Sequence, residues 1–236
     1  MACLYLIPTP LGATPTEWVL PVEINRIVRG LDYFIVENAK SARAFLKQVG
    51  TDKPLQDLDL RELSEHTSAN LLPDLLAPLV AGRDAGLLSE AGCPAVADPG
   101  ADLVHLAHAL GIRVKPLVGP SSILMAVMAS GLSGQRFAFH GYLPAKTDAR
   151  THALKQLERR ATADQAAQIF IETPYRNQAM LESILHACAP DTWLTLACDL
   201  STDTEYIASR RVMDWRAHLP ELNRRPCVFV IGRDPK

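Results

Sequence analysis

Short apolar runs that alternate with longer amphipathic segments restrict the fold of this chain more than any other feature. Cys3–Ile7, Tyr33–Val36 and Ala85–Leu88 are almost free of polar side chains, which is typical of strands buried on both faces of a sheet. A fourth strand is expected over Arg113–Pro116. Helices between these strands would complete βαβ units, so the pattern predicts an α/β fold with a mostly parallel sheet and helices on both faces.

An amphipathic segment follows the second of these runs. A helix is expected over Ser41–Val49, with the Ser41 side chain as its N-cap. Its buried face would hold Ala44, Phe45 and Val49.

The second half of the chain repeats the alternation in a different way. Two strand-like segments, Trp193–Asp199 and Glu205–Arg210, follow one another without a helix, which indicates a mixed sheet. We place the boundary between two α/β domains near Val118, so that the domains span 1–118 and 119–236. The other helices and strands expected here are Ser122–Ala129, Phe137–His140, Asp148–Arg159, Gln168–Glu172, Arg176–Cys188 and Cys227–Ile231.

Charge and cysteine usage exclude several classes of protein. The formal net charge is −2, so the chain lacks the strongly basic character of a DNA-binding protein, and no DNA partner is expected. Its five cysteines are scattered and form no closely spaced pair, which is typical of a reduced, cytoplasmic protein. The first residues lack a basic region and are interrupted by Pro8, and no apolar stretch approaches about 20 residues. Neither a secretion signal nor a membrane span is therefore expected.

No metal site is expected either. Asp102, His105 and His108 recur at every third residue of a helix predicted over Asp102–Leu110, which Gly111 would end. This spacing can place metal ligands on one face, but no fourth ligand is evident. A solvent-exposed helix face is the simpler interpretation.

Three turns rich in glycine and proline follow strands of the first half. In an open parallel sheet, ligands bind beyond the carboxyl ends of the strands, where glycine lets a backbone approach the ligand closely. No Gly-x-Gly-x-x-Gly motif opens the first helix, which makes a nucleotide-dependent oxidoreductase a poor alternative. The turns are Pro8–Gly12, Ser89–Gly100 and Val118–Ser122.

The order of these turns, together with motifs in the second half, resembles the tetrapyrrole methylase superfamily of S-adenosylmethionine-dependent methyltransferases. The resemblance is closest to the branch that methylates the ribose 2′-hydroxyl of a cytidine in small-subunit ribosomal RNA, and it runs over nearly the whole chain. The segments that carry it include Leu4–Gly12, Leu88–Pro94, Asp98–Gly100, Pro116–Ser122, Gly141–Lys146, Phe170–Arg176 and Asn223–Arg225.

The resemblance implies two α/β domains with S-adenosylmethionine in the cleft between them, and a homodimer. It also implies which positions of this chain meet the cofactor. In the first half and at the following helix start they are Leu11, Gly92, Cys93, Val96, Ser121 and Ser122. In the second half they are Glu172, Leu200, Pro226 and Cys227.

Methyl transfer needs little acid–base chemistry, but a hydroxyl acceptor would benefit from a base. Glu37, His66 and Glu90 are candidates because they lie in loops that follow strands. Arg176, beside a proline turn at a helix start, is a candidate clamp for a phosphate or carboxylate. A charge or cap on a solvated loop, or a surface ion pair for Arg176, is the simpler interpretation of each.

The departures from the branch pattern concern the acceptor side. Glu37–Lys40 replaces an acidic Glu-Asp-Thr-Arg run, Ser64–Thr67 replaces a His-Asp-His segment, and Cys198–Thr202 replaces Arg-Glu-Leu-Thr-Lys. The chain therefore resembles a divergent paralogue. Two alternatives stay open: a methyltransferase of the same fold for a small molecule such as a tetrapyrrole, and a non-catalytic protein that binds the cofactor or RNA.

Overall fold

The computed structural model describes residues 2–234, which divide into two compact units. Unit 1 is Met1–Ser121 and unit 2 is Ser122–Lys236. The sequence-based boundary near Val118 lies close to this division. Each unit has its own sheet and its own hydrophobic core.

The sheet of unit 1 is parallel throughout, as the apolar runs predict. Its strand order is β3-β2-β4-β1-β5, and every neighbouring pair is parallel. β2 and β4 are buried along their whole length, and β1 is buried except at the half-buried Tyr5 and Leu6, because helices cover both faces. The strands are β1 (Cys3–Ile7), β2 (Tyr33–Val36), β3 (Asp59–Glu62), β4 (Ala85–Leu88) and β5 (Arg113–Pro116).

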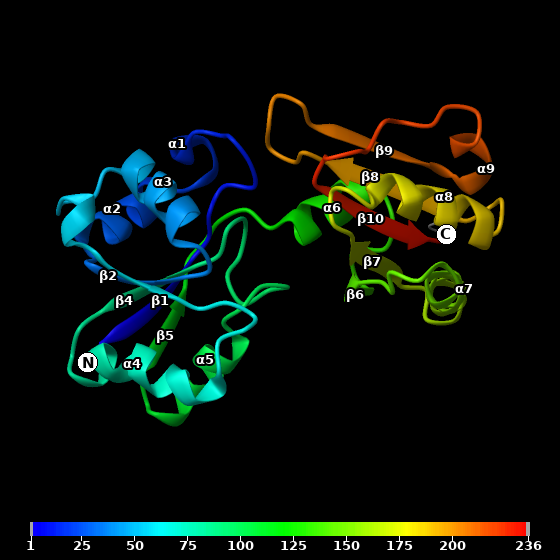
Figure 1. Cartoon of the computed structure of the whole chain (residues 1–236). Coiled ribbons are helices and arrows are strands. Elements are labelled where there is room, and N and C mark those ends of the chain that lie inside the picture. Colours follow the sequence, from blue (N-terminus) through cyan, green and yellow to red (C-terminus); the bar gives the residue numbers. More distant parts are fainter. Residues whose placement is uncertain (1, 235–236) are drawn as a thin grey trace. The chain divides into compact units, whose positions relative to one another are not determined.

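Helices lie on both faces of this sheet (Figure 1). One face packs on α2 and α3 through a cluster that includes Ile24, Phe45 and Leu46. The other face packs on α4 and α5 through Leu76 and Leu103. The helices of unit 1 are α1 (Thr16–Val19), α2 (Val22–Gly30), α3 (Ala39–Val49), α4 (Leu72–Val80) and α5 (Ala101–Ala109), with short 3-10 turns at Leu55–Asp57 and Ala69–Leu71.

The start of α3 corrects the sequence-based prediction. The N-cap is Asn38 and not Ser41, because the Asn38 side chain accepts hydrogen bonds from the backbone N–H groups of Lys40 and Ser41. The Ser41 hydroxyl donates instead to the Asn38 carbonyl oxygen, at 3.1 Å. Ala44, expected on the buried face, is exposed, and Ala42 and Leu46 are buried in its place.

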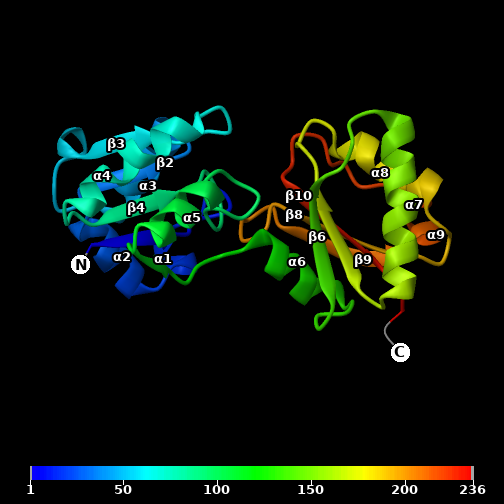
Figure 2. The same ribbon diagram turned by 90° about the horizontal axis from the view of Figure 1, so that it is seen from below.

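Unit 2 contains the mixed sheet that the second half predicts. Its strand order is β6-β7-β10-β8-β9; β6 and β7 are parallel, and the remaining pairs are antiparallel. Figure 2 shows α6 on one face of this sheet and α7 with α8 on the other. The elements are α6 (Ser122–Ser130), β6 (Phe137–Tyr142), α7 (Thr147–Ala163), β7 (Ala167–Ile171), α8 (Asn177–Ala187), β8 (Trp193–Cys198), β9 (Tyr206–Arg211), α9 (Val212–Trp215) and β10 (Cys227–Gly232).

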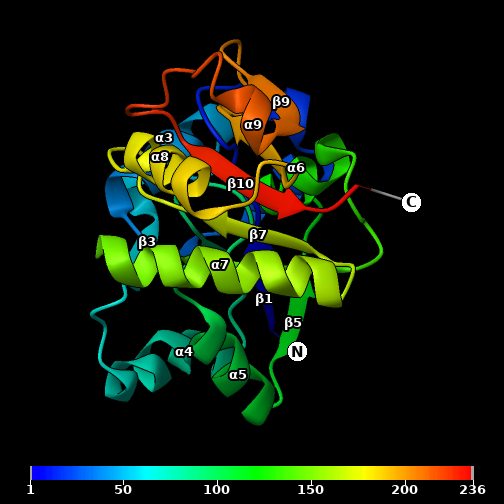
Figure 3. The ribbon, with the colours of Figure 1, turned by 90° about the vertical axis from the view of Figure 1, so that its right-hand side faces the viewer.

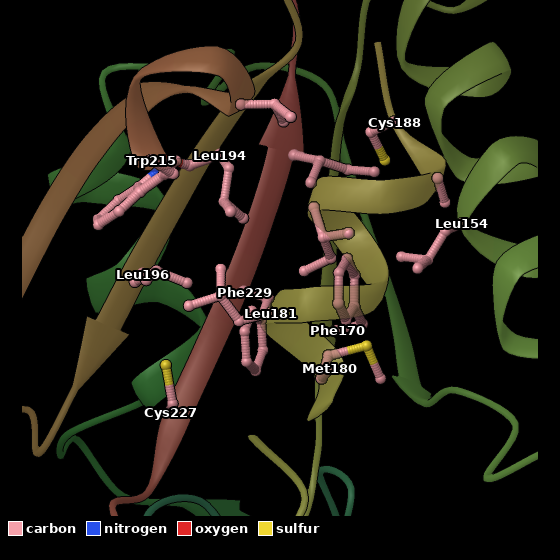
Figure 4. Close-up of a cluster of buried hydrophobic side chains, with 14 of the residues drawn as sticks. Leu154, Phe170, Met180, Leu181, Cys188, Leu194, Leu196, Trp215, Cys227 and Phe229 are labelled. Atoms are coloured by element: carbon pink, nitrogen blue, oxygen red, sulfur yellow. The ribbon is translucent and has the colours of Figure 1, made fainter. Parts of the chain in front are cut away.

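The core of unit 2 lies between the sheet and the helices α7 and α8 (Figure 4). Phe170 of β7 and Phe229 of β10 are directly paired across the strands and stack with their ring centroids 5.5 Å apart. Trp215 is fully buried and its indole N–H donates to the Leu194 carbonyl oxygen at 3.0 Å. This core holds the ends of β7, β8 and β10 in register, and those ends carry the second set of predicted site residues.

Within residues 2–234, no helix has both the length and the apolar character needed to cross a membrane.

Candidate functional site

The loops that follow β1, β4 and β5 are tied together in unit 1. Thr9 and Gly92 exchange two backbone hydrogen bonds, of 2.9 and 3.0 Å. The Cys93 thiol donates to the Pro120 carbonyl oxygen at 3.4 Å. Leu11 lies over Gly92, since a Cβ atom built on Gly92 would stand 3.2 Å from a Leu11 methyl carbon. The structure therefore joins the three turns that the sequence places at the ends of neighbouring strands.

The loop after Gly92 has a strained backbone around an exposed apolar side chain. Ala95 and Ala97 have φ values of 63° and 65°, in the left-handed region that alanine rarely adopts. Val96 lies between them and is 47% exposed. Strained residues of this kind concentrate at binding sites, where the surrounding structure holds them in place.

Cys93 is not an activated nucleophile. Burial, and then the nearby Asp98, raise the pKa of its thiol, although a hydrogen bond with Ser121 acts in the opposite direction. A thiol with a raised pKa is mostly protonated at neutral pH. This argues against a nucleophilic role only, and the contact of Cys93 with the cofactor stays a prediction.

Two of the predicted catalytic residues meet beside these loops. The backbone N–H of Glu90 donates to Glu37 Oε2 at 3.0 Å, although the two residues are 53 positions apart in the sequence. The Ser41 Oγ atom lies 3.1 Å from Glu90 Oε1 as well as from the Asn38 carbonyl oxygen, so its one hydrogen is available to either acceptor. The ends of β2 and β4 thus bring Glu37 and Glu90 together. His66 lies on an exposed turn, and no hydrogen bond among residues 2–234 joins its side chain to either carboxylate.

Asp98 is a candidate that the sequence analysis did not single out. Burial, and then Glu37, raise the pKa of Asp98 to about 6; Glu90 and Glu65 act in the same direction, and a hydrogen bond with Ser89 opposes them. Asp98 and Glu65 also line a cavity of about 290 Å³ in unit 1. A carboxylate that titrates near neutral pH is suited to accept a proton. The Asp98–Gly100 motif marked this position in the sequence. The sequence alone does not show that the fold places Glu37, Glu65 and Glu90 near Asp98.

Replacing Asp98 with asparagine is expected to stabilise the protein at neutral pH and not in acid. The unfolded chain releases this proton near pH 3.9, whereas the folded chain releases it near 6, so the wild type loses stability as the pH rises through this window. Asp98 is partly exposed, so we expect a gain of only about 1 kcal/mol at pH 7.5 and little change at pH 4. Urea unfolding at both pH values measures this, and an equal gain at both would contradict it.

Glu172 lies at the end of β7 in unit 2 with its side chain fully buried. Its Oε1 atom accepts from the Thr173 backbone N–H at 2.7 Å and from Arg176 Nη2 at 2.6 Å. Its Oε2 atom has no hydrogen-bond partner. Asn177, also fully buried, donates its amide to the Arg225 carbonyl oxygen at 2.6 Å and leaves Oδ1 without a partner. Buried acceptors of this kind indicate a place for a ligand that brings N–H or O–H donors.

The loops after β8 and before β10 lie at the same end of the sheet. Asp199 Oδ2 accepts from Arg225 Nε at 2.6 Å, and the Asp199 backbone N–H donates to the Pro226 carbonyl oxygen at 2.9 Å. Asp199, Ser201 and Arg224 all have positive φ values, of 49°, 64° and 62°. Among the described residues, left-handed non-glycine residues thus occur in the two predicted cofactor regions, with Gln165 as the exception.

The predicted cofactor residues differ in what they expose. Leu200 and Cys227 are buried, so a ligand would meet their backbone and not their side chains, whereas Pro226 is exposed. Ser121 and Ser122 are half-buried at the start of α6.

Two further features lie apart from the predicted cofactor residues. A larger cavity of about 680 Å³ in unit 2 is lined by Leu132–Gln135 and by the turn after α7, away from these residues. No three acids, cysteines or histidines of residues 2–234 are placed to hold a metal ion, and Asp102, His105 and His108 are exposed on α5.

Comparison with curated proteins identifies the family. The chain is 33% identical over 231 residues to ribosomal RNA small subunit methyltransferase I of Escherichia coli O157:H7, an alignment that covers 97% of this chain and 76% of that protein. The chain belongs to the ribosomal RNA small subunit methyltransferase I family. The family member from Streptococcus pyogenes serotype M6 is 32% identical over 232 residues, with 97% and 76% of the two chains covered. No family model matches the chain.

Solved structures confirm the predicted fold of this family member. The methyltransferase CobJ superposes with a TM-score of 0.65 at 16% identity, over 99% of this chain and 95% of that one. The uroporphyrin-III-C-methyltransferase from Thermus thermophilus gives a TM-score of 0.57 at 18% identity, with the same coverage. At these identities the likeness concerns the fold alone. The tetrapyrrole methylase-like fold and the methyltransferase class predicted from the motifs are both confirmed.

Proposed function

We propose that this protein transfers the methyl group of S-adenosylmethionine to a ribose 2′-hydroxyl of small-subunit ribosomal RNA. Family membership supports the reaction class. The observation in the structure that carries the proposal is that, in each unit taken by itself, left-handed residues occur in the loops that also hold the predicted cofactor residues.

The residues present fit the cofactor. In unit 1, the Leu11 side chain packs directly on the Gly92 backbone, which is possible because glycine has no side chain, and Leu11 and the exposed Val96 offer apolar contact for the methionine part. In unit 2, Glu172 Oε2 and Asn177 Oδ1 are buried acceptors without partners, and adenosine carries hydroxyl and amino donors. S-adenosylmethionine, when bound, supplies a methyl group already activated on a sulfonium.

The carboxylates at the ends of β2 and β4 would serve the acceptor. A ribose hydroxyl becomes a better nucleophile as it loses its proton, and Asp98, with a pKa of about 6, can receive that proton at neutral pH. Glu37 and Glu90 raise the pKa of Asp98 and so keep it in the useful range. Arg176 is already paired with Glu172, so its role would be to position that carboxylate.

Three finer statements belong to this function: the RNA acceptor and the homodimer rest on the resemblance, and the cytoplasmic location rests on the scattered cysteines. The acceptor is ribosomal RNA, the protein acts in the cytoplasm, and it functions as a homodimer. The net charge of −2 favours a second candidate, a small-molecule acceptor. Transfer of labelled methyl groups to purified small ribosomal subunits, compared with transfer to a small-molecule extract, distinguishes the two acceptors.

Titration calorimetry with S-adenosylhomocysteine tests the cofactor site first. We expect binding in the micromolar range and a loss of tenfold or more in Gly92→Ala, where the new Cβ meets Leu11. Gly82→Ala is the matched control, since Gly82 also has a positive φ but nothing within 4 Å of its Cβ position. We expect Gly82→Ala to bind like the wild type. Absence of heat at millimolar ligand with the wild type would overturn the proposed function.

A further inference from the structure

The exposed face of α7 in unit 2 carries an uninterrupted row of basic side chains. His152, Lys155 and Arg159 are spaced so that they lie on one side of the helix, and Arg160 lies beside them. All four are exposed. Figure 3 shows α7 along the outside of the unit, with α8 beside it, so this face of the helix is open to solvent.

Lys155, Arg159 and Arg160 are cations that are not neutralised within the described residues, whereas the His152 ring is hydrogen-bonded to the Gln156 side chain, with the two nitrogens 2.8 Å apart. Lys155, Arg159 and Arg160 form no ion pair within residues 2–234, whereas Arg176, Arg211, Arg225 and Arg233 of unit 2 are each paired with a carboxylate. Arg211 pairs with Asp234 and Arg233 pairs with Asp191. The structure therefore distinguishes the basic residues of α7, which form no ion pair in the described part of the chain, from the arginines that do. The sequence alone does not make this distinction.

The acid in the middle of α7 does not neutralise the row. Glu158 is half-buried and faces inward, where its Oε1 atom accepts from the Ala189 backbone N–H at 2.7 Å and from the Thr192 hydroxyl. The other acids of this region, Asp148 and Asp164, lie at the two ends of the helix. The middle of the exposed face therefore carries the charges of Lys155, Arg159 and Arg160 and no exposed carboxylate of α7.

We propose that His152, Lys155, Arg159 and Arg160, the α7 basic row, bind the phosphate backbone of the RNA substrate; this rests on the proposed function. Unpaired cations about one helical turn apart suit a repeating anion, and their binding releases counterions from the nucleic acid. No large apolar side chain is exposed on α7. A membrane surface or a protein partner would need apolar anchors that this face lacks.

The salt dependence of RNA binding tests the row. Fluorescence anisotropy with a labelled fragment of small-subunit ribosomal RNA, at several NaCl concentrations, gives the slope of log K against log salt. Each lost phosphate contact lowers the magnitude of this slope by about 0.7 to 0.9, so we expect a decrease of roughly 1.4 to 1.8 in Lys155→Gln/Arg159→Gln. The charge-preserving variant Lys155→Arg/Arg159→Lys should keep the wild-type slope.

Arg43→Gln/Lys47→Gln is the matched control, since it removes two exposed cations one turn apart on α3. We expect its slope to equal that of the wild type. Equal losses in the α7 variant and in this control would overturn the α7 basic row while the RNA acceptor stands. A wild type that binds no RNA at low salt, but does bind S-adenosylhomocysteine, would overturn both the row and the RNA acceptor.

Discussion

Replacing Gly119 with alanine is expected to destabilise unit 1 by about 2 to 3 kcal/mol and to abolish measurable cofactor binding. A Cβ atom at Gly119 would stand 2.4 Å from Pro8 Cβ and 2.8 Å from Pro8 Cγ, distances that carbon atoms do not tolerate. Pro8 and Gly119 belong to the loops after β1 and β5, so the clash would push apart two of the three loops that form the candidate site. The glycine is needed for this close approach and not for an unusual φ value.

Gly30→Ala is the matched control for this prediction. Gly30 is the last residue of α2, and nothing lies within 4 Å of its Cβ position, so alanine should be neutral or stabilising by up to about 1 kcal/mol. Thermal unfolding followed by circular dichroism would show a melting temperature about 5 to 10 °C lower for Gly119→Ala and no decrease for Gly30→Ala. A Gly119→Ala protein as stable as the wild type would mean that the two loops do not touch.

The central strands β1, β2 and β4 of unit 1 were predictable because burial on both faces leaves a simple signature, whereas the edge strand β3, whose residues are half-buried or exposed, was not predicted. The bounds of β2, β4 and β5 agree with the segments that were expected to be strands from the sequence. α4 is not predictable in this way, since Pro73 lies in its first turn, Pro78 lies inside it, and apolar residues occupy much of its sequence. The N-cap of α3 was misplaced because Ser41 and Asn38 both have capping side chains, and only the observed hydrogen bonds distinguish them.

The candidate site was predictable as a set of loops but not as a set of contacts. Parallel strands place their following loops at one edge of the sheet, so Glu37 and Glu90 could be predicted from the sequence as candidate catalytic residues. The raised pKa of Asp98 depends first on burial and then on the acids at 37, 90 and 65, whose approach is decided by strand order. The unpartnered oxygens of Glu172 and Asn177 depend on where each side chain's other hydrogen bonds go, which no spacing reveals.

The contributions of Glu172 and Arg176 to the free energy of unfolding are expected to be strongly coupled. Arg176→Met would leave the buried Glu172 carboxylate with the Thr173 N–H as its one remaining described donor. Loss of one partner of a buried pair costs about 3 to 5 kcal/mol, but the Arg176 side chain is 42% exposed, so we expect about 2 kcal/mol from urea unfolding. Glu172→Gln should cost less than about 1 kcal/mol, since the amide oxygen can still accept from Thr173.

The double variant Glu172→Gln/Arg176→Met decides whether this arrangement serves the fold or the ligand. If the uncompensated charge causes the loss in Arg176→Met, the double variant will be more stable than the sum of the single changes predicts, by about 1 kcal/mol or more. Calorimetry with S-adenosylhomocysteine supplies the second measurement. Both variants that carry Glu172→Gln should then bind at least tenfold more weakly, because the buried acceptor would be lost even where stability is recovered. Additive stabilities would show that the pair is not coupled, and unchanged affinity would remove Glu172 from the cofactor site.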